Sequence, residues 1–401
     1  MDTRVFGELI SAYGQQVLQE AVRLQPREVE FLQHFTILSR AHPPELARAA
    51  LETAILRQEA LAKFPYGERL YFTRPALEQA SNYEVSAHRA RRFAVFERVM
   101  DLGCSIGSDT LCLSETVPAT IGVDRDALRL SMAQANLHAM ERDARVAFLQ
   151  ADLTHRLPLA PQPGTALFFD PGRRRAERRV YSVQEYQPPL SVIREWLAVF
   201  AALGVKISPG VRLGELRDYE AEVEFISLRG ELKEAVLWFG PLKTASRRAT
   251  ILPGPHTLSG LPDPAGPADG LAQASEPGAY LYEPDPAILR AGLVRTLGQM
   301  LGAAQLDPDI AYLTGDHPVD TLLARRWRVE SWMPFGLKNL RATLRQKGIS
   351  QVVVKKRGSP LQPEQLIQAL RLKAAKDGPA VERVLFLTHL SGQPIVVICF
   401  P

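Results

Sequence analysis

Residues 99–109, VMDLGCSIGSD, join an apolar run to a loop that carries glycine at positions 103 and 107. The apolar run predicts a buried strand, and residues 108–117 predict the helix that follows it. Glycines in such a loop let the backbone approach a ligand, and the start of the helix offers unpaired N–H groups. The stretch therefore predicts a strand–loop–helix unit that binds a small molecule. Ser105 stands where many such loops have glycine, and a positive φ there would cost a serine about 1 kcal/mol.

Strands and helices alternate along the central region of the chain. Apolar patterns predict strands at 97–102, 120–124, 146–152, 165–170 and 204–208, and helices at 108–117, 125–140 and 191–201. This alternation indicates an α/β fold in which helices cover both faces of a parallel sheet. We therefore expect a doubly wound, Rossmann-like sheet, to which residues 222–240 and 247–252 add further strands.

Shifts in composition divide the chain into five predicted regions. These are a helical region at 1–72, the Rossmann-like domain at 73–252, a Pro/Gly-rich linker at 253–278, a small α+β unit at 279–333 with one helix at 287–301, and a second small unit at 334–401 with the order α-β-α-β-β. Early in the Rossmann-like domain, Thr73 caps one predicted helix, and Ser81 with Glu84 makes a capping box for the next.

The composition excludes several classes of protein. A net charge of +4 over 401 residues is too small for a chain-wide nucleic-acid-binding surface. Cys104, Cys112 and Cys399 are too few for a disulfide framework, and none has the spacing of a metal ligand. No signal peptide is evident, and no apolar run approaches the ~20 residues of a membrane-spanning helix. We expect a cytoplasmic protein with no metal, no membrane partner and no obligatory protein partner.

Acidic residues stand at the ends of four successive predicted strands, namely Asp101, Asp124, Asp152 and Asp170. Because parallel strands end at one edge of a sheet, we expect these acids along a single rim. A nicotinamide dinucleotide would bring a pyrophosphate, which fits poorly beside Asp101. S-adenosylmethionine instead carries a cationic amino group and a sulfonium, so the acidic rim favours it as the ligand. Asp101 would serve the amino group directly or through water, Asp124 the ribose diol and Asp152 the adenine amine.

Taken together and in order, DLGCSIGSD, GVD, QADL and DPGRR resemble motifs one to four of class I S-adenosylmethionine-dependent methyltransferases. Further stretches resemble a bacterial family of these enzymes with a ferredoxin-like unit and a C-terminal THUMP-like domain, and these are residues 72–93, VKISPG at 205–210, 280–292 and 332–348. The resemblance covers residues from about 70 to the end. It implies a seven-stranded methyltransferase sheet, a ferredoxin-like unit at 279–333 and a THUMP-like domain at 334–401. Because THUMP domains bind RNA, it also implies tRNA or rRNA as the substrate.

The resemblance further implies which residues form the site. The residues that would bind the cofactor are Asp101, Gly103, Cys104, Ser105, Gly107, Asp124, Arg125, Asp152, Leu153 and Asp170. Asp170 and Pro171 would be catalytic. Methyl transfer is an in-line displacement that depends on alignment, and Asp170 would orient the nucleophile or accept its proton.

The sequence departs from one familiar pattern directly after these two residues. Gly172 and Arg173 stand where base-amine methyltransferases of the D-P-P-aromatic type have proline and a ring that stacks on the flipped base. Tyr181 or Tyr186 could supply the ring instead. The pattern therefore leaves the methylated atom open.

Two groups of basic residues are candidates for RNA contacts. One is Arg173, Arg174 and Arg175; the other is a stripe of Lys338, Arg341 and Arg345 on the predicted helix 337–348, followed by Lys355, Lys356 and Arg357 at a strand end. An ordinary solvated surface has the same pattern. We expect a methyltransferase that acts on structured RNA. An RNA-binding protein whose methyltransferase fold does not catalyse, and a small-molecule methyltransferase, stay open as alternatives.

Overall fold

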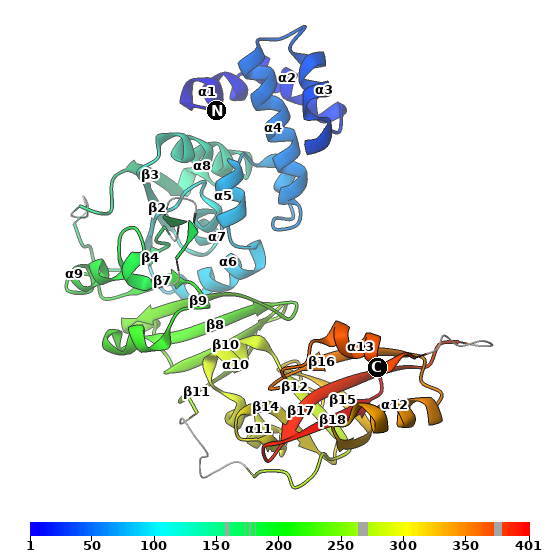
Figure 1. The fold of residues 1–401 in the computed structure, drawn as a ribbon. Helices are drawn as coiled ribbons and strands as arrows, with labels where there is room; N and C mark the ends of the chain where they lie inside the picture. Colours follow the sequence, from blue (N-terminus) through cyan, green and yellow to red (C-terminus); the bar gives the residue numbers. More distant parts are fainter. Residues whose placement is uncertain are drawn as a thin grey trace. The chain divides into compact units, whose positions relative to one another are not determined.

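The computed structural model describes residues 1–155, 157, 160–172, 174–175, 178–180, 182–263, 272–372 and 379–401, and for residues 174, 175, 178 and 179 it describes the backbone alone. The chain forms two compact units (Figure 1). The first consists of Met1–Glu222 and Lys233–Thr244, and the second of Val223–Leu232 and Ala245–Pro401. We describe each unit by itself.

Helices form the N-terminal part of the first unit, as the periodicity predicts. They are α1 (Thr3–Ile10), α2 (Ala12–Arg23), α3 (Phe31–Leu38) and α4 (Pro44–Ala60). Their buried faces share one hydrophobic core with Ile106, Met132 and Leu137, which belong to the region predicted as Rossmann-like. The N-terminal helices therefore pack against the same core as the sheet, although the sequence predicts a boundary at residue 72.

The buried side chain of Asn136 joins three segments of this unit. Its Nδ2 donates to the carbonyl oxygens of Tyr71 and Ile106, each across 3.0 Å, and its Oδ1 accepts the N–H of Tyr71 across 2.7 Å. All three of these hydrogen bonds are made with backbone groups, which satisfies the amide despite its complete burial.

Two short helices, α5 (Arg74–Gln79) and α6 (Tyr83–Ala90), follow the N-terminal region. Thr73 caps α5 as predicted, because its hydroxyl accepts the N–H of Ala76 across 3.3 Å. The predicted capping box of α6 is wrong. Asn82 is the N-cap residue, and the Ser81 hydroxyl donates to Glu234 instead. A buried tertiary partner has here replaced the local one that the sequence pattern suggests.

The sheet of the first unit contains β1 (Arg98–Leu102), β2 (Ala119–Asp124), β3 (Val146–Gln150), β4 (Thr165–Phe169), β7 (Leu203–Ile207) and β9 (Glu231–Phe239). Its order is β9-β7-β4-β1-β2-β3, with β9 antiparallel and the others parallel. The helices α7 (Ser108–Thr116), α8 (Ala127–Ala139) and α9 (Ile193–Leu197) connect these strands. The chain leaves β1 toward β2 and returns at β4, so the predicted doubly wound α/β fold is confirmed, with its switch point between β1 and β4.

The start of the second unit corrects two expectations. Here β10 (Arg247–Leu252) pairs with β8 (Glu222–Leu228) on one side and β11 (His256–Gly260) on the other. Residues 256–260, predicted as part of a linker, therefore form a strand. The expected count of seven strands is also too low, because residues 222–240 form two strands, β8 and β9, and β11 adds one that was not predicted.

The larger sheet of the second unit has the order β13-β14-β12-β15-β18-β17-β16. Its strands are β12 (Tyr280–Pro284), β13 (Ala304–Asp307), β14 (Ile310–Gly315), β15 (Ala324–Pro334), β16 (Gln351–Lys356), β17 (Glu382–Leu390) and β18 (Gln393–Cys399). Its helices are α10 (Pro286–Ala291), α11 (Val294–Leu301), α12 (Leu337–Gln346) and α13 (Pro363–Leu370). The order of elements after residue 334 is the predicted α-β-α-β-β.

Two expectations for this sheet are wrong. The single helix predicted at 287–301 is two helices, because Gly292 adopts a left-handed φ of +69° and ends α10. The domain boundary predicted between 333 and 334 falls within β15, which pairs with β12 near its start and β18 near its end.

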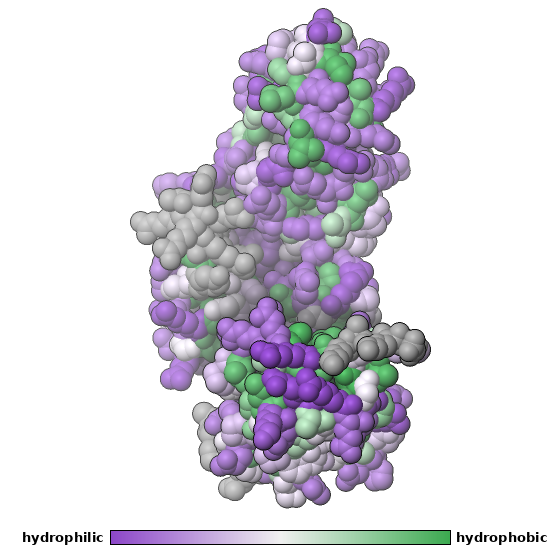
Figure 2. All heavy atoms as spheres, turned by 45° about the vertical axis from the view of Figure 1, so that its right-hand side comes forward, coloured by the Kyte–Doolittle hydropathy of each residue, from purple (hydrophilic) through white to green (hydrophobic). Residues whose placement is uncertain are grey.

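Hydrophilic side chains cover much of the face in Figure 2, with hydrophobic residues scattered among them. In the part of the chain that the structure describes, every helix is too short or too polar to cross a membrane.

Candidate functional site

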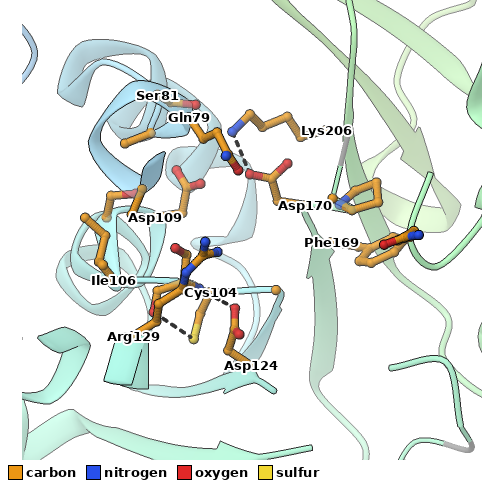
Figure 3. A pocket seen from close by; sticks show the side chains of 18 of the residues that line it. Gln79, Ser81, Cys104, Ile106, Asp109, Asp124, Arg129, Phe169, Asp170 and Lys206 are labelled. Carbon is orange, nitrogen blue, oxygen red and sulfur yellow. Dashed lines mark hydrogen bonds and ion pairs between the residues drawn. The ribbon is translucent and has the colours of Figure 1, made fainter. Parts of the chain in front are cut away.

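A cavity of about 790 Å³ lies at the carboxyl ends of β1, β2 and β4 in the first unit. This volume falls within the range of small-molecule sites. Figure 3 shows Asp124, Cys104 and Arg129 toward one end of the pocket and Asp170 with Lys206 toward the other. Of the predicted cofactor residues, the lining includes Gly103, Cys104, Ser105, Asp124, Arg125, Asp152, Leu153 and Asp170, together with the predicted catalytic Pro171. The fold thus brings most of the predicted site together, at the switch point of the sheet.

The loop after β1 has the backbone conformation that its glycines suggest. Gly103 has a φ of +84°, and a Cβ atom there would lie 2.6 Å from the carbonyl oxygen of Asp170. Any side chain at this position would therefore push apart the loops that follow β1 and β4. Gly107, also left-handed, precedes α7. Ser105 has a φ of +52°, so the serine does adopt the positive φ considered for it, at a cost of about 1 kcal/mol.

Asp124 and Asp152 lie on the cavity wall with their carboxylates already oriented. Asp124 accepts the N–H of Ser105 at Oδ2 across 2.9 Å and the N–H of Asp126 at Oδ1 across 3.0 Å. Asp152 accepts the N–H and the hydroxyl of Thr154, and these hydrogen bonds lower the pKa of its carboxyl. Each oxygen keeps lone pairs for a ligand, which suits the predicted contacts with a ribose diol and an adenine amine.

Asp101 has a different position from the predicted one. It is fully buried beneath the loop, outside the set of residues that line the cavity. Its Oδ2 accepts the Thr110 hydroxyl across 2.5 Å, while its Oδ1 has no partner among the described residues. Burial, together with the nearby Asp109 carboxylate, raises the pKa of Asp101 to about 8. The acid that lines the cavity at this place is Asp109 instead.

A buried ion network supports the same wall, and the sequence patterns do not reveal it. The Arg89 guanidinium donates to both Asp109 and Glu234, and the hydroxyls of Ser86 and Ser81 donate to these two carboxylates. Burial alone would raise the pKa of Asp109, but the charges of Arg89 and Lys206 outweigh it and lower that pKa. Because all of these groups are paired, the network fixes the walls formed by α6, α7 and β9.

Lys206 is the second feature that sequence reasoning missed. It lies on β7 with its side chain only 3% exposed, and its Nζ donates to Oδ2 of Asp170 across 2.6 Å (Figure 3). Lysine is rarely buried, since removing its charge from water is costly. A lysine within the otherwise apolar strand sequence GVKIS was the feature of the sequence that could have indicated a functional residue here.

Lys63 places a second ammonium group on the cavity wall. Its Nζ donates to the carbonyl oxygens of Leu77, Glu78 and Ala80, across 2.8 to 3.0 Å, at the end of α5. Burial and the charges of Lys206 and Lys233 lower the pKa of Lys63 to about 8. All three of its N–H donors are thus used for the backbone, so we assign Lys63 a structural role.

The predicted RNA-binding residues have mixed surroundings. Arg173 and Tyr181 lie outside the described residues, as do the side chains of Arg174 and Arg175. In the second unit, Lys338, Arg345 and Lys356 are exposed. Lys356 also donates to the side-chain oxygen of Gln362 across 3.0 Å. Three further cations are less exposed and make internal contacts: Arg341 with the carbonyl of Ala369, Lys355 with Glu283 and Arg357 with the carbonyl of Ala311.

Tyr186 does not supply the predicted stacking ring. It is 2% exposed, and its hydroxyl accepts the N–H of Ser208. The strand end at Asp170 therefore has no ring from this tyrosine to place over a base.

The residues of the cavity fit S-adenosylmethionine. The glycine loop leaves room for a ligand against the backbone, and Asp109, Asp124 and Asp152 provide acceptors for cationic and hydroxyl groups. Asp101 Oδ1 is a buried acceptor without a partner among the described residues, behind the same loop. Within the part of the chain described, we find no cluster of His, Cys, Asp and Glu side chains suited to a metal.

Comparisons with known proteins agree with this geometry. The chain is 34% identical over 350 residues to proteins of Mycobacterium tuberculosis strains CDC 1551 and H37Rv, each named an uncharacterized S-adenosylmethionine-dependent methyltransferase. The aligned region covers 84% of this chain and 92% of those proteins. The THUMP domain-like family matches residues 324–401, and a domain of unknown function (DUF8688) matches residues 2–60.

A solved structure has the same fold over the whole chain. It is a protein of Porphyromonas gingivalis W83 that is named as a methyltransferase, with a TM-score of 0.79 and 21% identity, over 100% of this chain and 98% of that one. The THUMP-like match begins at residue 324, the first residue of β15, ten residues before the boundary predicted from the sequence.

Proposed function

This chain belongs to the S-adenosylmethionine-dependent methyltransferases, and from that premise we propose that it methylates RNA, with tRNA or rRNA as the substrate class. S-adenosylmethionine is its cofactor, and it supplies an activated methyl group on a cationic sulfur. The observation that carries the RNA assignment is the THUMP-like domain at 324–401. An RNA substrate also makes the cytoplasm the expected place of action.

We assign the cofactor to the end of the cavity at which Asp124 and Asp152 lie. Asp124 would accept the ribose hydroxyls, Asp152 would accept the adenine amine, and the backbone of the Gly103–Ser105 loop would lie against the ligand. The buried Arg89 network holds Asp109 at the wall, where its carboxylate would attract the cationic amino group. Asp101 lies behind the loop, and its unpartnered Oδ1 would accept a hydrogen bond from the amino group of the cofactor, directly or through water.

Asp170 lies where the substrate atom that accepts the methyl group would have to approach. It follows β4 directly, its backbone N–H donates to Leu102, and Lys206 holds its carboxylate in place. We assign to Asp170 the role of orienting the nucleophile and accepting its proton.

Exposed cations on the THUMP-like domain support the choice of RNA. Lys338 and Arg345 project from α12 and Lys356 stands at the end of β16, whereas the apolar side of α12 packs into the core through Leu340 and Leu344. Such a helix presents charge to phosphate groups without loss of its packing.

Transfer of radiolabelled methyl groups to RNA tests the proposal. We would incubate the full chain with methyl-labelled cofactor and total RNA from cells that lack the gene, so that target positions are unmodified. We expect label in tRNA or rRNA and little in RNA from cells that have the gene. Cofactor binding in calorimetry without label in any RNA would overturn the RNA assignment, and absence of cofactor binding would indicate a fold that does not catalyse.

A further inference from the structure

We propose that the atom methylated is a hydroxyl oxygen, in RNA the 2′-hydroxyl of a ribose, and not the exocyclic amine of a base. This inference rests on the proposed function and specifies its acceptor. It is carried by the pairing of Asp170 with the buried ammonium group of Lys206 at the acceptor end of the cavity.

The Lys206 side chain points to the carboxylate of Asp170, and the atom that accepts the methyl group must lie beside that carboxylate. Its Nζ is 2.6 Å from Asp170 Oδ2, and the described residues offer Nζ no second hydrogen-bond partner. An ammonium group has three donors. Two of them are thus available to an oxygen atom that approaches Asp170.

The charged groups around this pair come from several elements of the first unit. The cations are Lys63, Arg89 and Lys233, and the anions are Asp109 and Glu234. Arg89 is already bound to both of these anions, and Lys63 is bound to backbone carbonyls. Among these cations, Lys206 is the one whose Nζ is hydrogen-bonded to Asp170, so the geometry assigns it to the atom that accepts the methyl group.

Charge development distinguishes the two classes of acceptor. An amine becomes positively charged when its nitrogen attacks a methyl group, and a buried ammonium beside it would raise the barrier. A hydroxyl oxygen becomes negatively charged as its proton leaves, and the same ammonium would stabilise it. The cation at the site thus favours oxygen.

The hydrogen-bonding groups of the site point the same way. An exocyclic amine needs acceptors for two N–H groups and a surface for its base, and Lys206 already occupies one of the acceptor positions of the Asp170 carboxylate. The residue after Pro171 is Gly172, which has no side chain, and Tyr186 is buried. A ribose hydroxyl needs only one acceptor for its proton and one donor for its oxygen, and Asp170 with Lys206 provides both.

The proposed step balances as follows. A lone pair of the hydroxyl oxygen forms the new O–C bond to the methyl group, and the C–S bond breaks with its electron pair left on sulfur, which becomes a neutral thioether. The hydroxyl proton passes to the Asp170 carboxylate and from there to water. Lys206 keeps its protons throughout and donates a hydrogen bond to the oxygen.

Alkaline hydrolysis of the labelled RNA tests this assignment without any variant. Alkali cleaves RNA through the free 2′-hydroxyl, so a 2′-O-methyl group leaves an alkali-resistant dinucleotide, whereas base methylation leaves labelled mononucleotides. We expect the label in dinucleotides. Label in mononucleotides alone would overturn the hydroxyl assignment and leave RNA methylation intact, and absence of label from RNA would overturn both.

Substitutions at Lys206 test its role separately. We expect Lys206→Met to lower kcat at least 100-fold and to change the Kd of the cofactor less than 3-fold, with Lys206→Arg restoring part of kcat. The control is Lys243→Met, which removes an exposed lysine bound to the carbonyl of Glu220. A folded Lys206→Met protein with unchanged kcat would contradict the role of Lys206. If that protein does not fold, Lys206→Arg must still give labelled dinucleotides at a reduced rate.

Discussion

The backbone N–H of Ser105 donates a hydrogen bond to Oδ2 of Asp124 across 2.9 Å, so the loop after β1 is held by the end of β2. The second oxygen of the same carboxylate accepts the N–H of Asp126. Both hydrogen bonds form within the protein alone. A ligand that reaches this carboxylate therefore finds it already oriented, which reduces the entropy lost on binding.

Replacement of Asp124 should weaken cofactor binding. Asp124→Ala removes the acceptor for the ribose hydroxyls and releases the loop at Ser105, and we expect the Kd to rise at least tenfold, about 1.4 kcal/mol or more. Isothermal titration measures it. The matched control is Asp126→Ala, which removes a neighbouring carboxylate that caps α8. It should lower stability by about 1 kcal/mol and leave the Kd unchanged. Equal Kd values for the two variants would contradict the assignment of Asp124.

Asp170 and Asp152 should affect different kinetic constants. Asp170→Asn keeps the size of the side chain but removes the proton acceptor, so we expect kcat to fall by roughly 10² to 10⁴ with the Kd of the cofactor within a fewfold of normal. Asp152→Asn should instead raise the KM for the cofactor and leave kcat within a fewfold. Methyl transfer at the normal rate by Asp170→Asn would remove its catalytic assignment.

The buried Asp101 should make stability depend on pH. Its pKa is about 8 in the folded chain and near 3.9 in an unfolded one, so the folded state binds this proton more tightly. The stability that this proton contributes is fully present below about pH 4 and is lost as the pH rises through about 8. Asp101→Asn mimics the protonated carboxyl and still accepts from Thr110. Its stability relative to the wild type should therefore increase between pH 5 and pH 8, as urea unfolding would measure. Two parallel pH curves would show that Asp101 is ionised in the folded state.

The exposed cations of the THUMP-like domain should determine how RNA affinity depends on salt. Each phosphate contact contributes a slope of about 0.7 to 0.9 in log K against log salt, so loss of Lys338, Arg345 and Lys356 to alanine should reduce the slope by about 2 to 3. The control removes Arg23, Arg27 and Arg40, three exposed arginines of the N-terminal region, with the same change in net charge. Equal losses in both triple variants would indicate a nonspecific charge effect.

The acids and the glycine loop could be predicted because each stands directly beside a strand with a clear apolar pattern. Asp124, Asp152 and Asp170 needed only the rule that parallel strands end at one edge. Asp101 satisfies the same rule, yet its side chain turns beneath the loop to Thr110. Which side of a loop a side chain occupies depends on packing, and the spacing of residues does not contain that information.

The buried ion network could not be predicted from local patterns. Arg89, Asp109 and Glu234 come from three elements separated by up to 145 residues, and each has an unremarkable local setting. Ser81 was assigned to a capping box because Glu84 follows at the right spacing, and the structure gives it Glu234 instead. Lys206, an isolated charge within an otherwise apolar strand, was the one signal that the sequence offered.

Asn136 has a consequence for how the first unit fluctuates. Its single amide binds the backbone at Tyr71, next to the N-terminal helices, and at Ile106, inside the loop that we assign to the cofactor. Local opening of either segment must break hydrogen bonds that hold the other, so the two should open together as one cooperative unit. We expect cofactor binding to slow deuterium uptake in α1, α2 and α4, none of whose residues lines the cavity, and Asn136→Ala to abolish that protection.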